Sequence, residues 1–278
     1  MKDYLSLLFM KFRNDIYEYY GKESRSFPWR STSDPYRILI SEIMLQQTQT
    51  FRVMGKYERF LEAFPDFSAL AQADLASVLT FWQGLGYNRR ALNLKKTAEI
   101  VMRDFGGRLP DSPEELTTLP GIGHATAGAI LAFAFNHPVV FIETNIRRVF
   151  IHCFFQDRQD ITDREILPLV EGTLDRNNPR QWYYALMDYG AMLKGQIPNP
   201  NRRSAHYTRQ SRFEGSDRQI RGKILRILVE KGDMIEGSLA EEIDMDTARV
   251  HKAIAQLKKE GFLVRKGALI RIAQGMPA

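Results

Sequence analysis

The sequence predicts an all-α protein followed by a small C-terminal domain of helices and one β-hairpin. Two observations lead to this prediction. Apolar residues recur at helical spacing in six segments before residue 136, whereas clear apolar–polar alternation is confined to residues 262–273. Short Pro- or Gly-containing breaks separate the helical segments, which favours a compact helical body. The composition, 44% hydrophobic and 26% charged over 278 residues, is globular and excludes a chain that is disordered throughout.

The helices are expected in a simple order along the chain. The helical segments are DYLSLLFMKFRNDIYEYY at 3–20, RILISEIMLQQT at 37–48, VMGKYERFLEAF at 53–64, ALAQADLASVLTFW at 69–82, RALNLKKTAEIVMRDF at 90–105 and TAGAILAFAF at 126–135. Two helix starts carry a capping residue followed by proline. Asp34 precedes Pro35, and Asp111 or Ser112 precedes Pro113.

The last third of the chain has a different pattern. Residues 199–216 form a basic linker that begins with alternating Pro and Asn. A helix at 217–232, a short helix at 238–244, a longer helix at 246–261 and a hairpin around Lys266-Gly267 then follow. This is the order of a winged helix-turn-helix domain, expected over 217–278. Arg249 and Lys252 on its third helix and Lys266 in its wing are the candidate DNA contacts. The alternative is a winged helix that docks a protein or forms a dimer.

The charge of +6 is unevenly distributed. Residues 1–193 carry a net charge of −1, residues 194–216 carry +4 and residues 217–278 carry +3. A polyanion-binding appendage has this distribution, and the alternative is a solvated basic tail. No apolar run reaches the length of about 18 residues that a membrane span needs, and the N-terminus lacks a cleavage site. We therefore expect no membrane association and a cytoplasmic protein, nucleoid-associated in a prokaryote.

A glycine-containing turn is expected between two helices. Gly121 and Gly123 flank Ile122, so the backbone can turn tightly while Ile122 points into the core. Amides at the start of the next helix, near His124, could then hold a phosphate without sequence preference. The alternative interpretation of these residues is an ordinary helical turn.

Two carboxylates have a sequence context that favours chemistry. Glu143 follows four apolar residues at the start of a helix, where it could stabilise a cationic sugar or orient a water, or could simply cap the helix. Glu42 shares a helix face with Ile38, Leu39 and Leu45. Burial there would raise its pKa and suit a general acid, whereas an edge position would expose it to water.

Six segments, taken together, give the chain a resemblance to a known family. They are FPWR at 27–30, PYRILISEIMLQQTQT at 35–50, FWQGLGYNRRALNL at 81–94, LPGIGHATAGAIL at 119–131, ETNIRRV at 143–149 and ALMDYGAM at 185–192. In this order they resemble the helix-hairpin-helix (HhH-GPD) DNA glycosylase superfamily, and the MutY-type adenine glycosylases in particular. The resemblance covers about Phe12 to Lys194. It implies a bilobal glycosylase domain over 1–198, with a six-helix lobe at about 31–134 and a second lobe from 1–30 and 135–198.

The resemblance also implies roles for single residues. Glu42 matches the acid that protonates the departing base, and Asn145 matches an Asn beside the catalytic carboxylate, which falls on Glu143. Gln47 and Tyr87 match residues that push into the base stack. The DNA-gripping hairpin corresponds to Gly121, Ile122, Gly123 and His124, and Asp188 matches a structural acid.

Departures from the family pattern are equally specific. Glu143 stands where the family has Asp, Ala125 where endonuclease III has a Lys nucleophile, and Asn88 where MutY has a second Tyr. Lys194 occupies the place of the first iron–sulfur cysteine, and the sequence has one cysteine, so we expect no cluster, disulfide or metal site. The resemblance admits a monovalent cation at the hairpin. The winged helix stands in place of the domain that reads 8-oxoguanine.

The resulting hypothesis is a monomeric, monofunctional base-excision-repair glycosylase. It would act on double-stranded DNA and hydrolyse the N-glycosidic bond of a flipped, damaged or mispaired base. The resemblance implies adenine opposite 8-oxoguanine as the first candidate substrate. A mismatched uracil or thymine, or another altered base, is the alternative within this class. A non-catalytic DNA-binding or regulatory protein is the alternative of another class.

Overall fold

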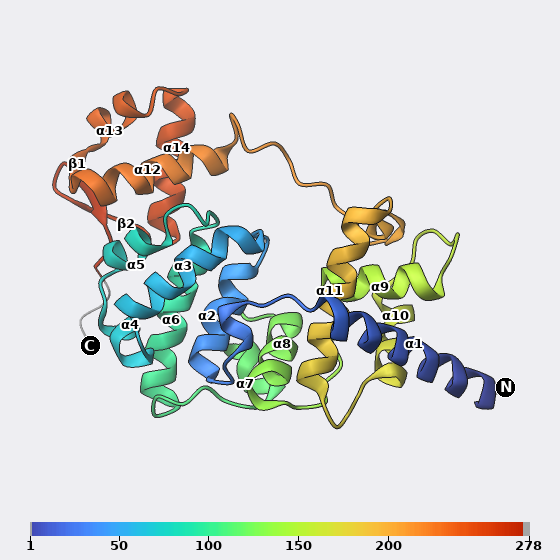
Figure 1. Ribbon diagram of the computed structural model, residues 1–278. Helices are drawn as coiled ribbons and strands as arrows, with labels where there is room; N and C mark the ends of the chain where they lie inside the picture. The colour runs from blue at the N-terminus through green and yellow to red at the C-terminus, as the bar shows by residue number, and fades with distance from the viewer. Residues whose placement is uncertain (1, 275–278) are drawn as a thin grey trace. The chain divides into compact units, whose positions relative to one another are not determined.

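The structure, a computed structural model, describes residues 2–274 and contains two compact units. The first unit comprises the residues up to 39 together with 111–118 and 122–209. The second comprises 40–110, 119–121 and the residues from 210 onward. Each unit is built from segments that are distant in the sequence, as the colours in Figure 1 show.

The first unit is a group of helices around α11 (Pro179–Gln196). Helices α1 (Lys2–Glu23), α8 (His124–Phe135) and α9 (Thr144–Phe154) pack against it, and α10 (Asp163–Thr173) packs against α1 and α9 (Figure 1). Helix α7 (Pro113–Thr118) precedes α8, and two short 3₁₀ helices, η1 (Pro28–Arg30) and η2 (Pro200–Arg203), complete the unit. An aromatic cluster fills the space between α1, α9 and α11 and consists of Phe12, Phe150, Phe154 and Trp182.

The second unit contains a helical lobe in which α6 (Arg89–Asp104) is central. Helices α4 (Phe67–Gln72) and α5 (Leu75–Trp82) pack on α6, and α3 (Thr50–Ala63) packs on α5. The fully buried side chains of Phe60, Leu70 and Trp82 form its core. Helix α2 (Pro35–Leu45) crosses the boundary between the units after Leu39.

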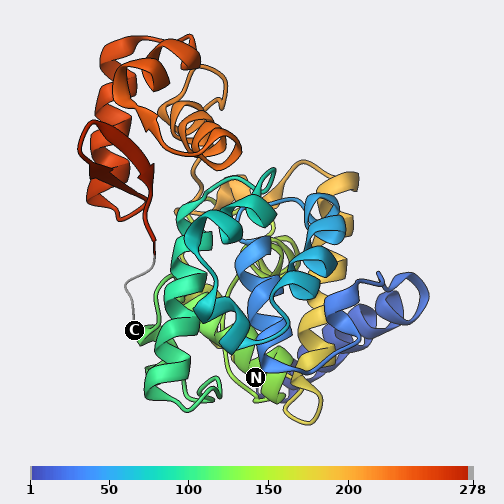
Figure 2. The same ribbon diagram turned by 90° about the vertical axis from the view of Figure 1, so that its left-hand side faces the viewer.

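The C-terminal part of the second unit has the predicted winged-helix order. Helices α12 (Asp217–Lys231), α13 (Glu236–Ile243) and α14 (Thr247–Lys259) precede the hairpin of β2 (Leu263–Lys266) and β3 (Leu269–Ile272). A short strand β1 (Met234–Ile235) pairs antiparallel with β3, so the strand order is β1-β3-β2 (Figure 2). In the hairpin Leu263 faces Ile272 and Lys266 faces Leu269. Gly267 turns the chain with a φ of +60°.

The predicted fold class is confirmed, and all six predicted helical segments are helical over most of their length. Two boundaries differ from the expectation. The segment at 69–82 is two helices, because the Asp74 side chain caps α5 by accepting a hydrogen bond from the Ser77 amide at 2.7 Å. The segment at 37–48 ends as α2 at Leu45 and continues as a turn in which Gln47 has a φ of +53°.

The two helix starts predicted from a capping residue followed by proline are also confirmed. The Asp34 carboxylate accepts from the Arg37 amide at 3.1 Å, and the Ser112 hydroxyl accepts from the Glu115 amide at 3.2 Å. Within residues 2–274, no helix is long and apolar enough to cross a membrane.

Candidate functional site

The hairpin between α7 and α8 has an exposed backbone and one buried anchor. Gly121, Gly123 and His124 are exposed, whereas the Ile122 side chain is only 4% exposed. Gly121 has a φ of +81°, and a Cβ atom there would lie 2.9 Å from Asn93 Nδ2, so the position requires glycine. Gly123 precedes α8 and offers no side chain to cap it. The first amides of α8 are therefore open to an anion.

Gln47 and Tyr87 lie in two separate turns of the second unit. Gln47 follows α2 and is exposed, whereas Tyr87 precedes α6 and is half-buried. Both residues have a positive φ, +53° for Gln47 and +48° for Tyr87. Non-glycine residues rarely adopt this conformation, and where they do, the surrounding structure must hold them.

Tyr87 also contacts the residues that lead into the winged helix. Its hydroxyl accepts a hydrogen bond from Arg218 Nη1 at 2.8 Å and another from the Gln210 amide. Nearby, Arg89 forms an ion pair with Glu260 at 2.7 Å. The Tyr87 turn and the C-terminal domain are thus joined by polar contacts within the second unit.

Glu42 lies on the last part of α2, in the second unit. Its side chain is half-buried, and the side chains of Ser41 and Ile43 on either side are almost fully buried. Helix α2 therefore presents Glu42 at a partly exposed position.

Glu143 is the N-cap of α9 in the first unit. Its Oε1 accepts hydrogen bonds from the backbone amides of Asn145 at 2.7 Å and Ile146 at 2.9 Å. Its Oε2 accepts a longer bond from Asn145 Nδ2 at 3.3 Å. The capping interpretation of Glu143 is therefore correct. It does not exclude a chemical role, because capping engages mainly one of the two carboxylate oxygens.

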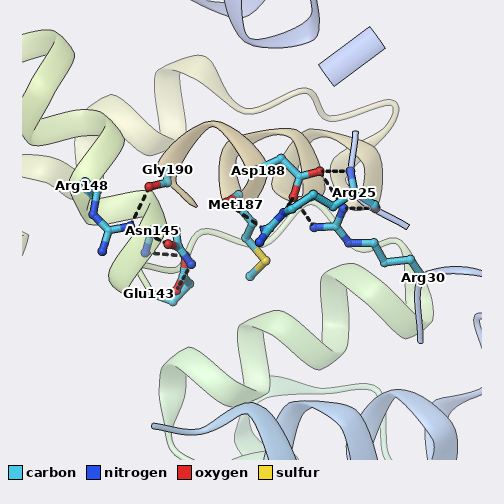
Figure 3. A network of polar contacts seen from close by, with 8 residues as sticks. All are labelled: Arg25, Arg30, Glu143, Asn145, Arg148, Met187, Asp188 and Gly190. Carbon is cyan, nitrogen blue, oxygen red and sulfur yellow. Dashed lines mark hydrogen bonds and ion pairs between the residues drawn. The ribbon is translucent and has the colours of Figure 1, made fainter. Parts of the chain in front are cut away.

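A chain of polar contacts orients Asn145 beside Glu143 (Figure 3). Asn145 Oδ1 accepts from Arg148 Nη1 at 2.7 Å, and the same Arg148 nitrogen donates to the Gly190 carbonyl at 2.6 Å. Helices α9 and α11 approach closely here, since a Cβ on Gly190 would lie 2.6 Å from the Asn145 carbonyl oxygen. The Asn145 side chain is thereby fixed with its amino group toward Glu143.

Burial and hydrogen bonding act on the pKa of Glu143 in opposite directions. Burial raises the pKa of the Glu143 carboxyl group, while the amides of Ile146 and Asn145 and the charge of Arg148 oppose the increase without cancelling it. Burial also lowers the pKa of Arg148, and the Glu143 carboxylate opposes that shift.

The buried side chain of Asp188 forms ion pairs with two arginines, Arg25 and Arg30 (Figure 3). Its Oδ1 lies 2.6 Å from Arg25 Nε and 2.7 Å from Arg30 Nη2, and its Oδ2 accepts from Arg30 Nη1 at 2.8 Å. Burial alone would raise the pKa of Asp188, but the hydrogen bonds from Arg30 and Arg25 outweigh it and hold the pKa below its ordinary value. The network ties the segment after α1 to α11.

The candidate DNA contacts of the winged helix differ in their surroundings. Arg249 donates to Asp217 Oδ1 at 2.6 Å and to the Gly215 carbonyl at 2.8 Å. Lys252 on α14 and Lys266 at the end of β2 are exposed. The charge of Arg249 is therefore partly neutralised by its neighbour.

Two buried arginines beside the expected site residues were not singled out in the sequence. Arg148 supports Asn145, and Arg90, 8% exposed, lies beneath the turns of Gln47 and Tyr87. Both arginines lie within segments that carry the family resemblance, ETNIRRV and GYNRRAL, and this is the sequence feature that could have identified them.

An iron–sulfur cluster does not fit the residues of this chain. Such clusters are held by four cysteine thiolates, and the sequence has one cysteine, Cys153 on α9. Lys194, in the last turn of α11, cannot replace a thiolate ligand. Within residues 2–274, no group of three or more His, Cys, Asp or Glu side chains is arranged to hold a metal ion.

Residues 40–171 match the family described as HhH-GPD superfamily base excision DNA repair protein. An adenine DNA glycosylase of Mycobacterium tuberculosis is 31% identical over 278 aligned positions, which cover 90% of each chain. One of Buchnera aphidicola is 38% identical over 192 positions, 68% of this chain and 53% of the relative, and one of Homo sapiens is 32% identical over 66% of this chain and 36% of the relative. The chain thus spans about half of the Buchnera relative and nearly all of the mycobacterial one.

Solved structures show a similar fold. A thermostable thymine-DNA glycosylase has a TM-score of 0.63 and 27% identity, with 69% of this chain and 90% of that chain covered. An endonuclease III in a non-covalent DNA complex has a TM-score of 0.59 and 18% identity, with 69% and 89% covered. Both similarities thus extend over most of this chain, but not over all of it.

Proposed function

Because the chain belongs to the HhH-GPD superfamily of base excision DNA repair proteins, we propose that it is a monofunctional DNA glycosylase that releases adenine from duplex DNA. The curated relatives support adenine as the base, since those in bacteria and mammals are named adenine DNA glycosylases. The finer proposal, taken from the family resemblance, is adenine paired with 8-oxoguanine.

The observation that carries this proposal is the fixed carboxylate of Glu143. The longer side chain, compared with the family's Asp, folds back onto the amides of Asn145 and Ile146. Its second oxygen has a single, longer contact to Asn145 Nδ2. A preorganised anion of this kind stabilises the positive charge that develops on a sugar as a glycosidic bond breaks.

The proposed reaction divides the work between two acids. Glu42 donates a proton to the departing adenine, and Glu143 stabilises the oxocarbenium-like sugar. Water then adds to C1′ and releases a proton to solvent, which leaves an abasic site, and Glu42 regains its proton from solvent. Asn145 positions the Glu143 carboxylate, supported by Arg148. Since Ala125 stands where a Schiff-base lysine would lie, the proposal contains no covalent step at that residue.

DNA binding is assigned to three groups of residues. The exposed turn of Gly121 and Gly123 with the start of α8 would hold a backbone phosphate, with Ile122 as its anchor and His124 beside it. Gln47 and Tyr87 would enter the base stack while the target base is extruded. Lys252 and Lys266, with a smaller share from Arg249, would contact phosphates through the winged helix.

The remaining parts of the proposal follow from this activity. The enzyme acts as a monomer in the compartment that holds the DNA, the cytoplasm and nucleoid of a prokaryote. It uses no iron–sulfur cluster and no catalytic metal ion.

A panel of duplexes tests the proposal. Each duplex carries one candidate base: adenine opposite 8-oxoguanine, guanine or cytosine, or thymine or uracil opposite guanine. Abasic sites are scored by alkaline strand cleavage under single-turnover conditions. We expect the fastest cleavage for adenine opposite 8-oxoguanine. Release of thymine or uracil alone would favour the activity named for the structurally similar thymine-DNA glycosylase, and inertness on every duplex would favour a binding protein.

A further inference from the structure

Arg90 gathers the backbone oxygens at the end of α2. Its Nη1 donates to the carbonyls of Ile43 at 2.9 Å, Met44 at 2.8 Å and Gln46 at 2.6 Å. These carbonyls lie at the C-terminal end of a helix, where the partial negative charge favours a cation. The contacts explain why α2 ends at Leu45 and the chain turns into the positive φ of Gln47.

The other guanidinium nitrogen of Arg90 holds the second turn. Its Nη2 donates to the carbonyls of Leu85 at 3.2 Å and Gly86 at 3.1 Å, immediately before Tyr87. It also donates to the Thr48 hydroxyl at 2.9 Å, immediately after Gln47. The guanidinium group of Arg90 therefore binds the backbone of the Gln47 turn and that of the Tyr87 turn at the same time.

The guanidinium also contacts the ring of Tyr87 itself. Its carbon lies 5.5 Å from the centre of the Tyr87 ring and 5.3 Å from that of Trp82, within the range of a cation–π interaction. The side chain of Trp82 is fixed in turn, because its Nε1 donates to the Gly86 carbonyl at 3.0 Å. Arg90 thus touches both the backbone before Tyr87 and its aromatic ring.

Arg90 occupies this place at an electrostatic cost. Its side chain is buried, its Nε has no hydrogen-bond partner among the described residues, and burial lowers its pKa to about 10. A surface arginine would avoid this cost. What only arginine provides is a rigid fork whose two terminal nitrogens lie within hydrogen-bond distance of six oxygens in two turns at once.

We propose that Arg90 is a positioning residue that fixes Gln47 and Tyr87 relative to each other, so that both meet the DNA base stack as a preformed pair. The inference rests on the proposed function, since it assumes that a base is extruded from a duplex. It goes beyond that function in assigning one buried side chain, Arg90, a positioning role at both extruding residues. Misplacing an aligned group by about 1 Å can cost on the order of 100-fold in rate.

The test uses the full chain with Arg90→Lys and Arg90→Met, and Lys95→Met as the matched control. Lys95 is another buried cation on α6 whose Nζ donates to a carbonyl, that of Ala71, at 2.9 Å. Lysine keeps the charge of Arg90 but presents no planar fork. Thermal unfolding of each variant identifies those that remain folded at the assay temperature.

The readout is the fluorescence of 2-aminopurine placed next to the target base, which rises when bases unstack and requires no bond cleavage. We expect the wild-type chain and Lys95→Met to produce the rise, and Arg90→Lys to slow it by about 100-fold while binding undamaged duplex with unchanged affinity. In a Gln47→Ala/Tyr87→Ala background, Arg90→Lys should have no further effect.

Two results would overturn the inference. One is an unchanged rate of unstacking in folded Arg90→Lys. The other is an equal slowing by Arg90→Lys in the Gln47→Ala/Tyr87→Ala background, because a general structural defect would act in both. A wild-type fluorescence rise that Arg90→Lys slows, with no release of any base, would instead refute the proposed function and leave the role of Arg90 supported.

Discussion

Replacing Glu143 by Gln removes the negative charge of this side chain and keeps its capping oxygen. The amide oxygen of Gln can still accept from the Asn145 and Ile146 amides, which the Glu143 carboxylate now binds at 2.7 and 2.9 Å. The 3.3 Å hydrogen bond from Asn145 Nδ2 disappears, because an amino group replaces the oxygen that accepts it. The substitution therefore separates the capping role of Glu143 from its proposed chemical role.

The two roles predict effects of very different size. A carboxylate about 4 Å from a sugar cation contributes roughly 4 kcal/mol at an effective dielectric constant of about 20. Since about 1.4 kcal/mol corresponds to a tenfold change in rate, we expect excision to slow by about 1,000-fold. Losing a cap altogether costs about 1 kcal/mol of stability, so Glu143→Gln should change the free energy of unfolding by less than that.

Single-turnover excision of adenine opposite 8-oxoguanine measures the first effect, and urea unfolding measures the second. Glu143→Asp keeps both charge and cap on a shorter arm, so it should excise faster than Glu143→Gln. Asp74→Asn is the matched control, because Asp74 also caps a helix, α5, and has no proposed role in the reaction. An excision rate of Glu143→Gln within a few-fold of wild type would refute the assignment of Glu143 as a catalytic residue.

Three further predictions concern pH, stability and DNA affinity. The proposed reaction requires the ionised form of Glu143, and burial raises the pKa of this carboxyl group. The single-turnover excision rate should therefore fall as pH decreases through a value above 4.5. The residual activity of Glu143→Gln should not show this acidic limb. Asp188→Asn should lower the free energy of unfolding, measured with urea, by about 3 kcal/mol, because two arginines lose a buried carboxylate partner. Asp163→Asn is the control, and it should lower the free energy of unfolding by less than about 1 kcal/mol, because Asp163 is partly exposed. The pKa of Asp188 is lower in the folded than in the unfolded protein. The stabilisation by Asp188 is therefore fully present above the unfolded pKa and is lost as pH falls through the folded pKa. An unchanged midpoint of acid unfolding in Asp188→Asn would contradict this stabilisation. Lys252→Ala and Lys266→Ala should each weaken binding to any duplex and reduce the slope of log affinity against log salt by about 1, and an unchanged slope would exclude phosphate contact.

Helical periodicity predicted most of the fold because most of the helices bury one apolar face and expose the other. The periodicity did not reveal the break at Asp74, since a cap within a continuous apolar pattern leaves the pattern intact. Strand β1, Met234–Ile235, was also missed, because two residues are too few for an alternating pattern. The end of α2 could not be found locally, since Arg90, which binds its last carbonyls, is more than forty residues away.

For the candidate site, sequence and structure contributed different information. The sequence points to Glu143 because a carboxylate after four apolar residues is unusual, and helix capping is one of the interpretations that this position allows. That its second oxygen is held by Asn145, and Asn145 by Arg148, depends on the close packing of α9 on α11 at Gly190. Arginines in a helix usually indicate a solvated surface, so sequence alone gave Arg148 no role.

The identity of the released base tests the central claim most directly. The full chain is incubated with a duplex that holds a single adenine opposite 8-oxoguanine, and the small-molecule fraction is analysed by mass spectrometry. The account predicts free adenine together with an abasic strand that breaks only after alkali. An intact strand with no free base, or release of a different base from its own duplex while adenine is retained, would contradict it.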